Sequence, residues 1–238
     1  MSVVRAHVVT IPIALAEVRE LHALEVEPDS GSDSPVLLFL HGMGEAGSSL
    51  SELPLVCVHQ TPPFQAILGC LPGTLVIAPQ APPVPSKEEW NWRDYVKGLA
   101  AFLTDRYAKR RIVATGFSRG GLGVLQIVSA YPDLVQTWAS VDPQPARDQV
   151  ETRAILPSPE LATRGWLRYG LYRSRNDAWK SFSSLLFDQL PERNRDVVEL
   201  SHAQMAVQAY NGSSLTAAAG KENLYDHLGL KFQPAHPG

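Results

Sequence analysis

Continuously apolar runs alternate with amphipathic stretches along most of the chain. Residues Val36 to Leu40 are all apolar, as expected of a strand that is buried on both faces. Comparable runs follow at 75–78, 111–115 and 137–141, and weaker ones at 166–172 and 196–200. Helix-like stretches lie at 92–107, 121–131, 178–190, 203–210 and 222–228. Strands that alternate with helices predict a mostly parallel sheet with helices on both faces.

The N-terminal part of the chain has a different pattern. Segments 3–13 and 19–26 show partial alternation of apolar and polar residues, which predicts a pair of antiparallel strands. A turn rich in Asp, Ser and Gly follows at 29–35. Much later, the polar, proline-containing segment 146–164 predicts an excursion over the carboxyl edge of the sheet. Because no repeat or low-complexity linker is present, we expect one α/β domain over residues 1–238.

Composition and charge limit the kinds of molecule that the protein is expected to bind. Apolar residues make up 45% of the 238 positions, which is ample for a large core. The formal net charge is −3, and the densest basic run is only Lys109-Arg110-Arg111, so we expect no nucleic-acid partner. No apolar run approaches the length needed to cross a bilayer, so we also expect no membrane span.

Cellular location and cofactors follow from what the sequence lacks. The N-terminus has no secretory signal pattern, so we expect a cytoplasmic protein. The 2 cysteines, Cys57 and Cys70, are too few for a disulfide framework and are expected to be free thiols. No residues have zinc or calcium ligand spacing, and no dinucleotide fingerprint follows a strand, so we expect no metal and no cofactor. The sequence leaves open whether the chain forms a homodimer.

One pentapeptide carries the candidate chemistry. Gly116-Phe117-Ser118-Arg119-Gly120 lies between the apolar run that ends at Thr115 and the helix-like stretch that follows it. A Gly-x-Ser-x-Gly between a strand and a helix is typical of a nucleophile elbow, a turn so tight that side chains at its glycines would collide with the backbone. We therefore predict that Ser118 is a nucleophile.

A nucleophilic serine needs a general base and an acid that orients the base. Of the histidines that follow Ser118, His202 comes directly after a strand-like run, so we predict that His202 is the base. Asp177 follows the run at 166–172 and is the predicted acid. Asp142, at the end of the preceding strand, is the alternative.

Acyl transfer also needs donors for an oxyanion and a pocket for the substrate. The N–H of Arg119 and that of Met43 are the predicted donors, with Gly44 as the second choice in the turn after the first buried strand. In the same turn, His41 is expected to be a structural hydrogen-bonder. Three tryptophans are candidates for an acyl or aryl pocket, with core packing as the alternative for each: Trp90, Trp92 and Trp179.

With these residues placed, the chain resembles the α/β-hydrolase superfamily. More narrowly, it is similar to the esterase group that includes predicted peptidases, phospholipase/carboxylesterases and feruloyl-esterase-like proteins. The similarity covers residues 36 to about 142 and rests on segments 37–42, 53–63, 78–80, 116–121 and 131–133. It implies an α/β-hydrolase fold and a carboxylic ester hydrolase that acts on small acyl or aryl esters through an acyl-enzyme. A peptidase or amidase for short peptides, or a catalytically silent fold used for binding, are the alternatives.

Overall fold

A single eight-stranded sheet organises the structure. The computed structural model describes residues 4–28, 33–83, 92–145, 149–170, 182, 185–186, 188–213 and 223–235. The strands are β1 (Arg5–Pro12), β2 (Glu20–Glu27), β3 (Val36–Leu40), β4 (Leu75–Gln80), β5 (Ile112–Phe117), β6 (Thr137–Val141), β7 (Gly165–Gly170) and β8 (Arg195–Val198).

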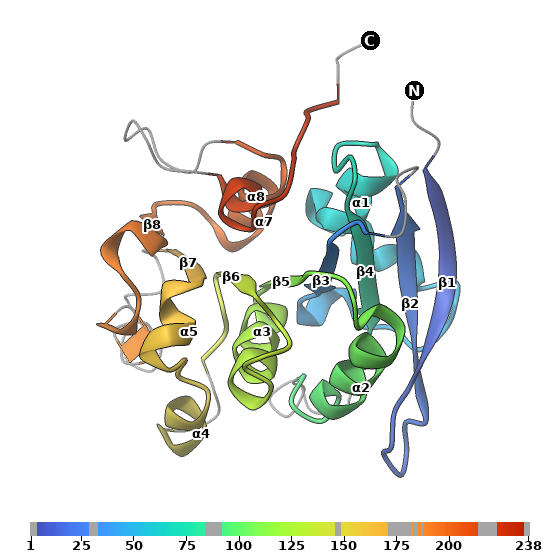
Figure 1. The fold of residues 1–238 in the computed structure, drawn as a ribbon, viewed down its shortest axis with the longest axis horizontal. Helices are drawn as coiled ribbons and strands as arrows, with labels where there is room; N and C mark the ends of the chain where they lie inside the picture. The colour runs from blue at the N-terminus through green and yellow to red at the C-terminus, as the bar shows by residue number, and fades with distance from the viewer. Residues whose placement is uncertain are drawn as a thin grey trace.

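The sheet is mostly parallel. Its strand order is β1-β2-β4-β3-β5-β6-β7-β8, which Figure 1 shows from right to left. Strands β3 to β8 pair in parallel, whereas β2 pairs antiparallel with both β1 and β4. The predicted mostly parallel sheet with antiparallel N-terminal strands is therefore confirmed.

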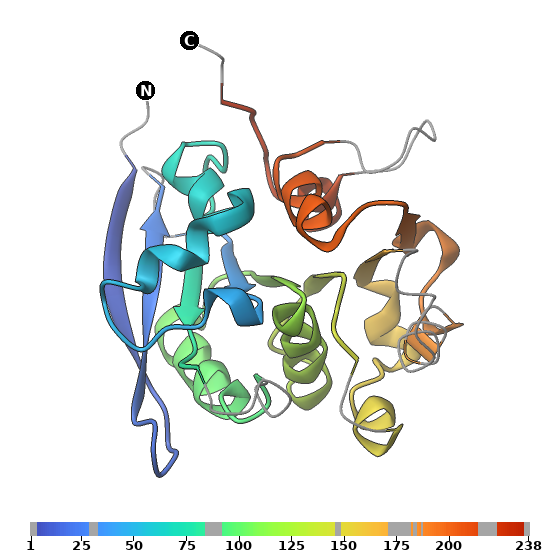
Figure 2. The same ribbon diagram turned by 180° about the vertical axis from the view of Figure 1, so that it is seen from behind.

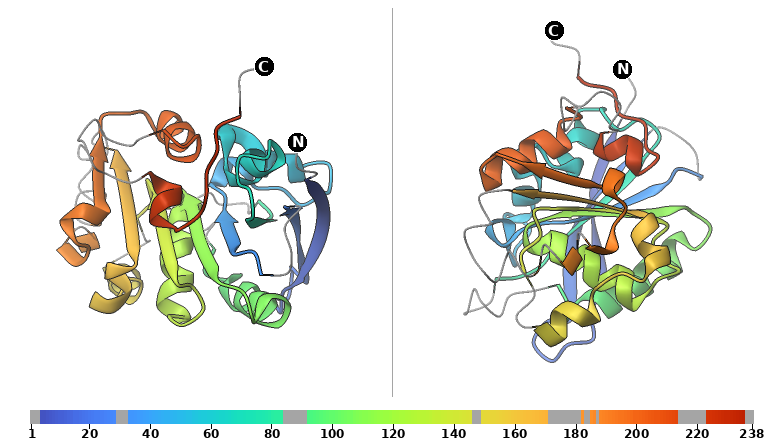
Figure 3. Two further views of the ribbon diagram at one scale, coloured as in Figure 1. Left: turned by 45° about the horizontal axis from the view of Figure 1, so that its top comes forward. Right: turned by 90° about the vertical axis from the view of Figure 1, so that its left-hand side faces the viewer.

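Helical segments cover both faces of the sheet. They are η1 (Met43–Glu45), η2 (Leu53–Gln60), α1 (Pro62–Ile67), α2 (Val96–Tyr107), α3 (Arg119–Ala130), α4 (Gln149–Ala154), α5 (Pro159–Thr163), η4 (Glu192–Asn194), α7 (His202–Tyr210) and α8 (Leu224–His227). Figures 1 and 2 show α7 and α8 above the sheet and α2 and α3 below it. Figure 3 gives two more views of this arrangement.

Two apolar cores flank the sheet, and alternate residues of each central strand point into them. In β3, Val36, Leu38 and Leu40 pack in the core under α2 and α3. Leu37 and Phe39 pack in the other core, which residues of η2, α1, α7 and α8 complete. Because both faces are covered, all of β3 is buried, which explains its continuous apolar run.

Within the segment 146–164, the described residues 149–164 do not follow the predicted path over the carboxyl edge of the sheet. Its described part forms α4 and α5 and contacts the C-terminal end of α3: Ser129 Oγ donates to Ile155 O at 2.9 Å, and Arg164 Nη2 donates to Pro132 O at 3.3 Å. Since α3 begins at the carboxyl edge, its far end lies toward the amino edge. The segment is thus a crossover connection from β6 to β7, because parallel strands require one.

Some predicted elements differ in extent or are only partly described. Residues 92–95 form a turn, and helix α2 begins at Val96. Of the helix predicted at 178–190, only part lies within the described residues. Among the residues that the structure describes, no helix has the length and apolar character to span a bilayer.

Candidate active site

Ser118 lies at a sharp turn between β5 and α3. Its backbone has φ 59° and ψ −119°, in a region that favours glycine and that is strained for serine. Two hydrogen bonds hold the turn against the end of β6: the Ser118 N–H donates to Val141 O at 2.9 Å, and the Gln144 N–H donates to Ser118 O at 3.1 Å. The geometry is that of a nucleophile elbow.

The glycines of the elbow are required by close backbone contacts. A Cβ on Gly120 would overlap the carbonyl of Leu40 at the end of β3, and a Cβ on Gly116 would overlap Gly120 O. A Cβ on Gly121 would stand 2.8 Å from Ser140 Oγ. The pattern of the pentapeptide is therefore explained by packing of α3 directly onto the sheet.

His202 and Asp142 form a hydrogen-bonded pair next to the elbow. His202 is the first residue of α7, and its Nδ1 is bonded to Asp142 Oδ2. Asp142 is fully buried, and its other oxygen accepts the Gly170 N–H at 3.2 Å. The ring of Phe117, the neighbour of Ser118, lies 4.3 Å from the His202 ring, centroid to centroid. These contacts place the imidazole beside the elbow and hold it in one orientation.

The contact between His202 and Asp142 bears on the choice of acid. The predicted acid, Asp177, lies outside the described residues, as do the pocket candidates Trp90 and Trp179. Asp142, the alternative from the sequence, has φ 44° and donates its N–H to Arg168 O at 2.8 Å, so that its carboxyl faces α7. The observed pairing therefore favours Asp142.

The predicted oxyanion donors lie at the first residues of two helical segments. Met43 begins η1 and Arg119 begins α3, and the first N–H groups of a helix have no partner within it. The two segments are adjacent, because a Cβ on Gly42 would stand 3.3 Å from Ser118 Cβ and 3.5 Å from Phe117 O. Helix N-termini favour negative charge, so this arrangement suits an oxyanion.

Buried hydrogen bonds hold the turn that carries Met43. His41 is fully buried, and burial lowers its pKa to about 4, so its ring is neutral at physiological pH. Its Nε2 accepts the Ala81 N–H at 3.0 Å, and its Nδ1 contacts Gly42 O at 2.5 Å. Gln80 Nε2 donates to Glu45 O at 2.9 Å. His41 thus has the structural role that the sequence indicated.

Trp92 belongs to the core and does not line an open pocket. Its side chain is fully buried, and its Nε1 donates to His41 O at 3.1 Å. A Cβ on Gly123 of α3 would collide with the Trp92 ring at 2.6 Å. The pocket prediction for Trp92 is therefore wrong. The ring fills the space between α3 and the turn after β3, where a large apolar area is buried.

The structure adds two residues that the sequence analysis did not assign, Glu45 and His59. Glu45 ends η1 and is 7% exposed, yet its Oε2 has no hydrogen-bond partner among the described residues. Its Oε1 lies 3.6 Å from His59 Nε2. Adjacency to the His-Gly turn was the only sequence signal for Glu45. His59 lies in segment 53–63, which carries part of the resemblance, but no role for it could be read from the sequence, because only the fold brings η2 to this edge.

Neither cysteine offers a competing nucleophile. Both are free, and burial raises the pKa of the Cys57 thiol to about 11 and also raises that of Cys70. A thiolate is the reactive form of cysteine, so these side chains are inert at neutral pH.

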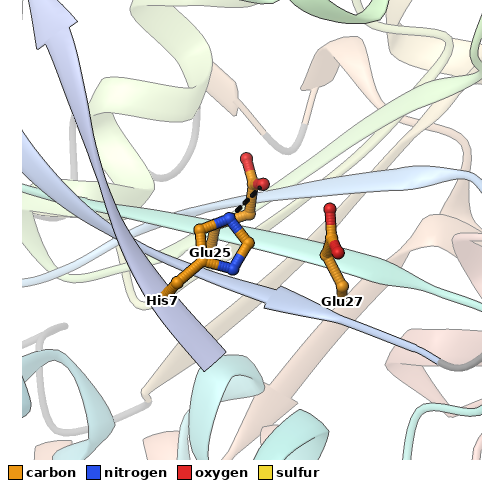
Figure 4. Close-up of side chains that lie close together, drawn as sticks. All are labelled: His7, Glu25 and Glu27. Atoms are coloured by element: carbon orange, nitrogen blue, oxygen red, sulfur yellow. Dashed lines mark ion pairs between the residues drawn. The ribbon is translucent and has the colours of Figure 1, made fainter. Parts of the chain in front are cut away.

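One cluster of possible metal ligands occurs among the described residues, far from the elbow on β1 and β2. Figure 4 shows His7, Glu25 and Glu27, whose ligand atoms lie within 4.8 Å of one another. The Glu25 carboxylate, however, already lies 2.9 Å from His7 Nε2 and accepts from Arg106 Nη2 at 3.0 Å and from the Tyr107 hydroxyl. A guanidinium that occupies the carboxylate disfavours a cation, so we interpret the cluster as a structural ion-pair network.

Comparisons with known proteins identify the fold. No family model matches the chain, and no curated protein is similar to it in sequence. Among solved structures, a thermostable esterase superposes with a TM-score of 0.55 at 20% identity, over 81% of this chain and 54% of the other. The chain therefore spans about half the length of that esterase.

Two further structures cover more of their own length. A hyperthermophilic esterase from the archaeon Pyrobaculum calidifontis gives a TM-score of 0.56 at 17% identity, over 85% of this chain and 77% of the other. Brefeldin A esterase, a bacterial homologue of human hormone sensitive lipase, gives 0.55 at 12% identity, over 87% and 72%. At such low identity the likeness shows the fold, and the chain has the α/β-hydrolase fold.

Proposed function

We propose that the chain is a serine carboxylic ester hydrolase for small acyl or aryl esters, in which Ser118, His202 and Asp142 are the catalytic residues. The observation that carries this proposal is the buried Asp142 carboxyl bonded to His202 Nδ1 beside a strained Ser118. The esterases of the same fold support the class of reaction.

In the proposed mechanism, His202 Nε2 takes the proton of Ser118 Oγ as the oxygen attacks the ester carbonyl. Asp142 keeps the proton of the imidazole on Nδ1 and stabilises the imidazolium that forms. The Met43 and Arg119 N–H groups stabilise the negative oxygen of the tetrahedral intermediate. His202 then protonates the departing alcohol, and an acyl group remains on Ser118. Water, activated by His202, releases the acid and restores the serine.

The nucleophile is tested with p-nitrophenyl esters of increasing acyl length and with a fluorophosphonate label. We expect the wild type to hydrolyse short esters and to be labelled. Ser118→Ala should lower kcat by about 10³-fold or more without unfolding the chain, because the covalent route is lost. Near-normal turnover by Ser118→Ala would contradict the proposal. Labelling together with cleavage of peptide anilides instead of esters would favour a peptidase, and no labelling would favour a silent fold.

The identity of the residue that orients His202 is tested by making the same change, Asp to Asn, at two positions. Asp142→Asn should lower kcat by on the order of 10³- to 10⁴-fold, since an amide at this position favours the wrong imidazole tautomer. Asp177→Asn is the matched control and should retain most of the activity. The reverse order of effects, in variants whose circular dichroism spectra are native, would assign the role to Asp177.

A further inference from the structure

The turn that carries Met43 also brings a carboxyl group to the nucleophile. Glu45 ends η1 and its side chain folds back over Gly42. A Cβ on Gly42 would stand 2.9 Å from Glu45 Oε2 and 3.3 Å from Ser118 Cβ, so both residues lie against Gly42. The proposed ester hydrolysis does not use this carboxyl group.

The Glu45 carboxyl group is poorly compensated. Its side chain is 9% exposed, and Oε2 has no hydrogen-bond partner among the described residues. Burial raises the pKa of Glu45. This rise is opposed by the charge of His59, by the N–H groups of Glu45 and Gly42, and more weakly by the charge of His202. Within the part of the chain that the structure describes, no lysine or arginine forms an ion pair with it. A buried carboxylate with an oxygen that accepts no hydrogen bond costs free energy, part of which a bound cation would recover.

His59 lies beside Glu45 in a conformation that is unusual for its residue type. Its φ is 63°, and that of Gln60 is 56°. Such backbone persists only where the surroundings enforce it, and it is common at ligand sites. The His59 ring stands edge-on to Phe117 at 6.3 Å between centroids, and Phe117 in turn lies against His202. His59, Glu45 and the catalytic histidine therefore surround the same region.

We propose that Glu45 and His59 form a subsite beside Ser118 that binds an ammonium group of the substrate, so that esters carrying an amine near the scissile bond are preferred. Glu45 supplies the negative charge, with Oε2 as the acceptor oxygen, and His59 lies beside the other oxygen. A carboxylate-bearing ester would be disfavoured by the same charge. This inference rests on ester hydrolysis at Ser118.

Matched ester pairs test the preference on either side of the scissile bond. For the acyl side the pair is alanine methyl ester and methyl isobutyrate; for the alcohol side it is 2-(dimethylamino)ethyl acetate and 3-methylbutyl acetate. We expect the amine of at least one pair to have a kcat/KM on the order of 10- to 100-fold higher, the size expected of one charge-assisted hydrogen bond. Glu45→Gln should abolish that ratio while hydrolysis of the neutral ester persists.

Control variants separate recognition from loss of charge or structure. Glu192→Gln removes an exposed carboxylate of η4, at the other edge of the sheet, and should leave the ratio unchanged. His59→Asn should reduce the ratio, and Asn tolerates the positive φ. Because burial disfavours the ionised Glu45, Glu45→Gln should also unfold at a temperature equal to or above that of the wild type, whereas a merely structural role would lower it.

The inference is wrong if neither pair shows an amine preference, or if the preference survives in Glu45→Gln. Binding measured without turnover distinguishes this failure from failure of the proposed function. NMR titration of Ser118→Ala with the same pairs should show tighter binding of the amine, and the difference should vanish in Ser118→Ala/Glu45→Gln. If no ester is hydrolysed by the wild type, equal affinity for both members of each pair still refutes the subsite.

Discussion

A buried ion pair joins the last two strands of the sheet behind the proposed catalytic acid. Arg168 of β7 is fully buried and Asp196 of β8 is 2% exposed. Arg168 Nη2 and Nε both donate to Asp196 Oδ2, at 2.9 and 3.0 Å. The backbone carbonyl of Arg168 also accepts the Asp142 N–H at 2.8 Å. The pair thus anchors the strand on which Asp142 rests.

We predict that Asp196→Ala lowers the free energy of unfolding by about 3–5 kcal/mol, because it removes the carboxylate to which two N–H groups of a buried guanidinium donate. For a chain of this length, the loss corresponds to a fall in Tm of about 6–20 °C. Burial already lowers the pKa of Arg168, against the charge of Asp196, so desolvation of the cation is the larger effect. Asp196 Oδ1 has no hydrogen-bond partner among the described residues, so the pair itself recovers only part of its desolvation cost.

The double variant Arg168→Met/Asp196→Leu is the decisive comparison. With both charges replaced by apolar groups, we expect stability close to that of the wild type or above it. Urea unfolding of the wild type, both single variants and the double variant, followed by tryptophan fluorescence and circular dichroism, gives the coupling energy. A cost below about 1 kcal/mol for Asp196→Ala, or a double variant as unstable as the single one, would show that burial of this charge pair does not have the expected effect on stability.

Two further predictions concern the elbow and the ion-pair network on β2. Gly120→Ala should abolish fluorophosphonate labelling and lower the yield of folded protein, because the new methyl group would overlap the Leu40 carbonyl. Gly44→Ala is the control and should unfold as the wild type does, because nothing lies within 4 Å of its Cβ. Equal stability of the two variants would contradict the packing argument. Burial alone would raise the pKa of Glu25, but hydrogen bonds from Arg106 and a neighbouring tyrosine outweigh it and lower that pKa. The ionised form therefore stabilises the fold above the unfolded pKa of 4.5, and this stability is lost as the pH falls through the lower pKa of the folded state. In urea unfolding, the free energy by which the wild type is more stable than Glu25→Gln should shrink as the pH falls below 4.5. A difference in stability that does not depend on pH would argue against the network.

Local pattern was sufficient for most of the architecture. The continuous apolar run of β3 reflects burial on both faces, and the alternation at the N-terminus reflects an antiparallel pair at the edge of the sheet. The elbow was equally readable from its pentapeptide, although the contact that requires glycine at 120 is with the Leu40 carbonyl of a distant strand. His202 could be nominated from its place after the last strand. In each case the residues that show the pattern lie close together along the chain.

The path of 146–164 and the role of Trp92 were not readable in this way. A polar, proline-containing segment suits a loop over the sheet as well as a crossover with two short helices, and only packing against α3 distinguishes them. A tryptophan offers the same apolar area to a pocket and to a core. Trp92 is in the core because Gly123 has no side chain, which lets the indole ring pack directly against α3.

The relation between charged groups at the carboxyl edge was a matter of tertiary structure alone. Asp142 lies 60 positions before His202 and meets it because β6 and α7 converge at that edge. Glu45 and His59 approach Ser118 because η1 and η2 return over the same strand ends. The spacing of residues along the chain does not predict such contacts, since they depend on how several loops pack together. The candidate nucleophile was therefore a property of the local sequence, and its charged surroundings were a property of the fold.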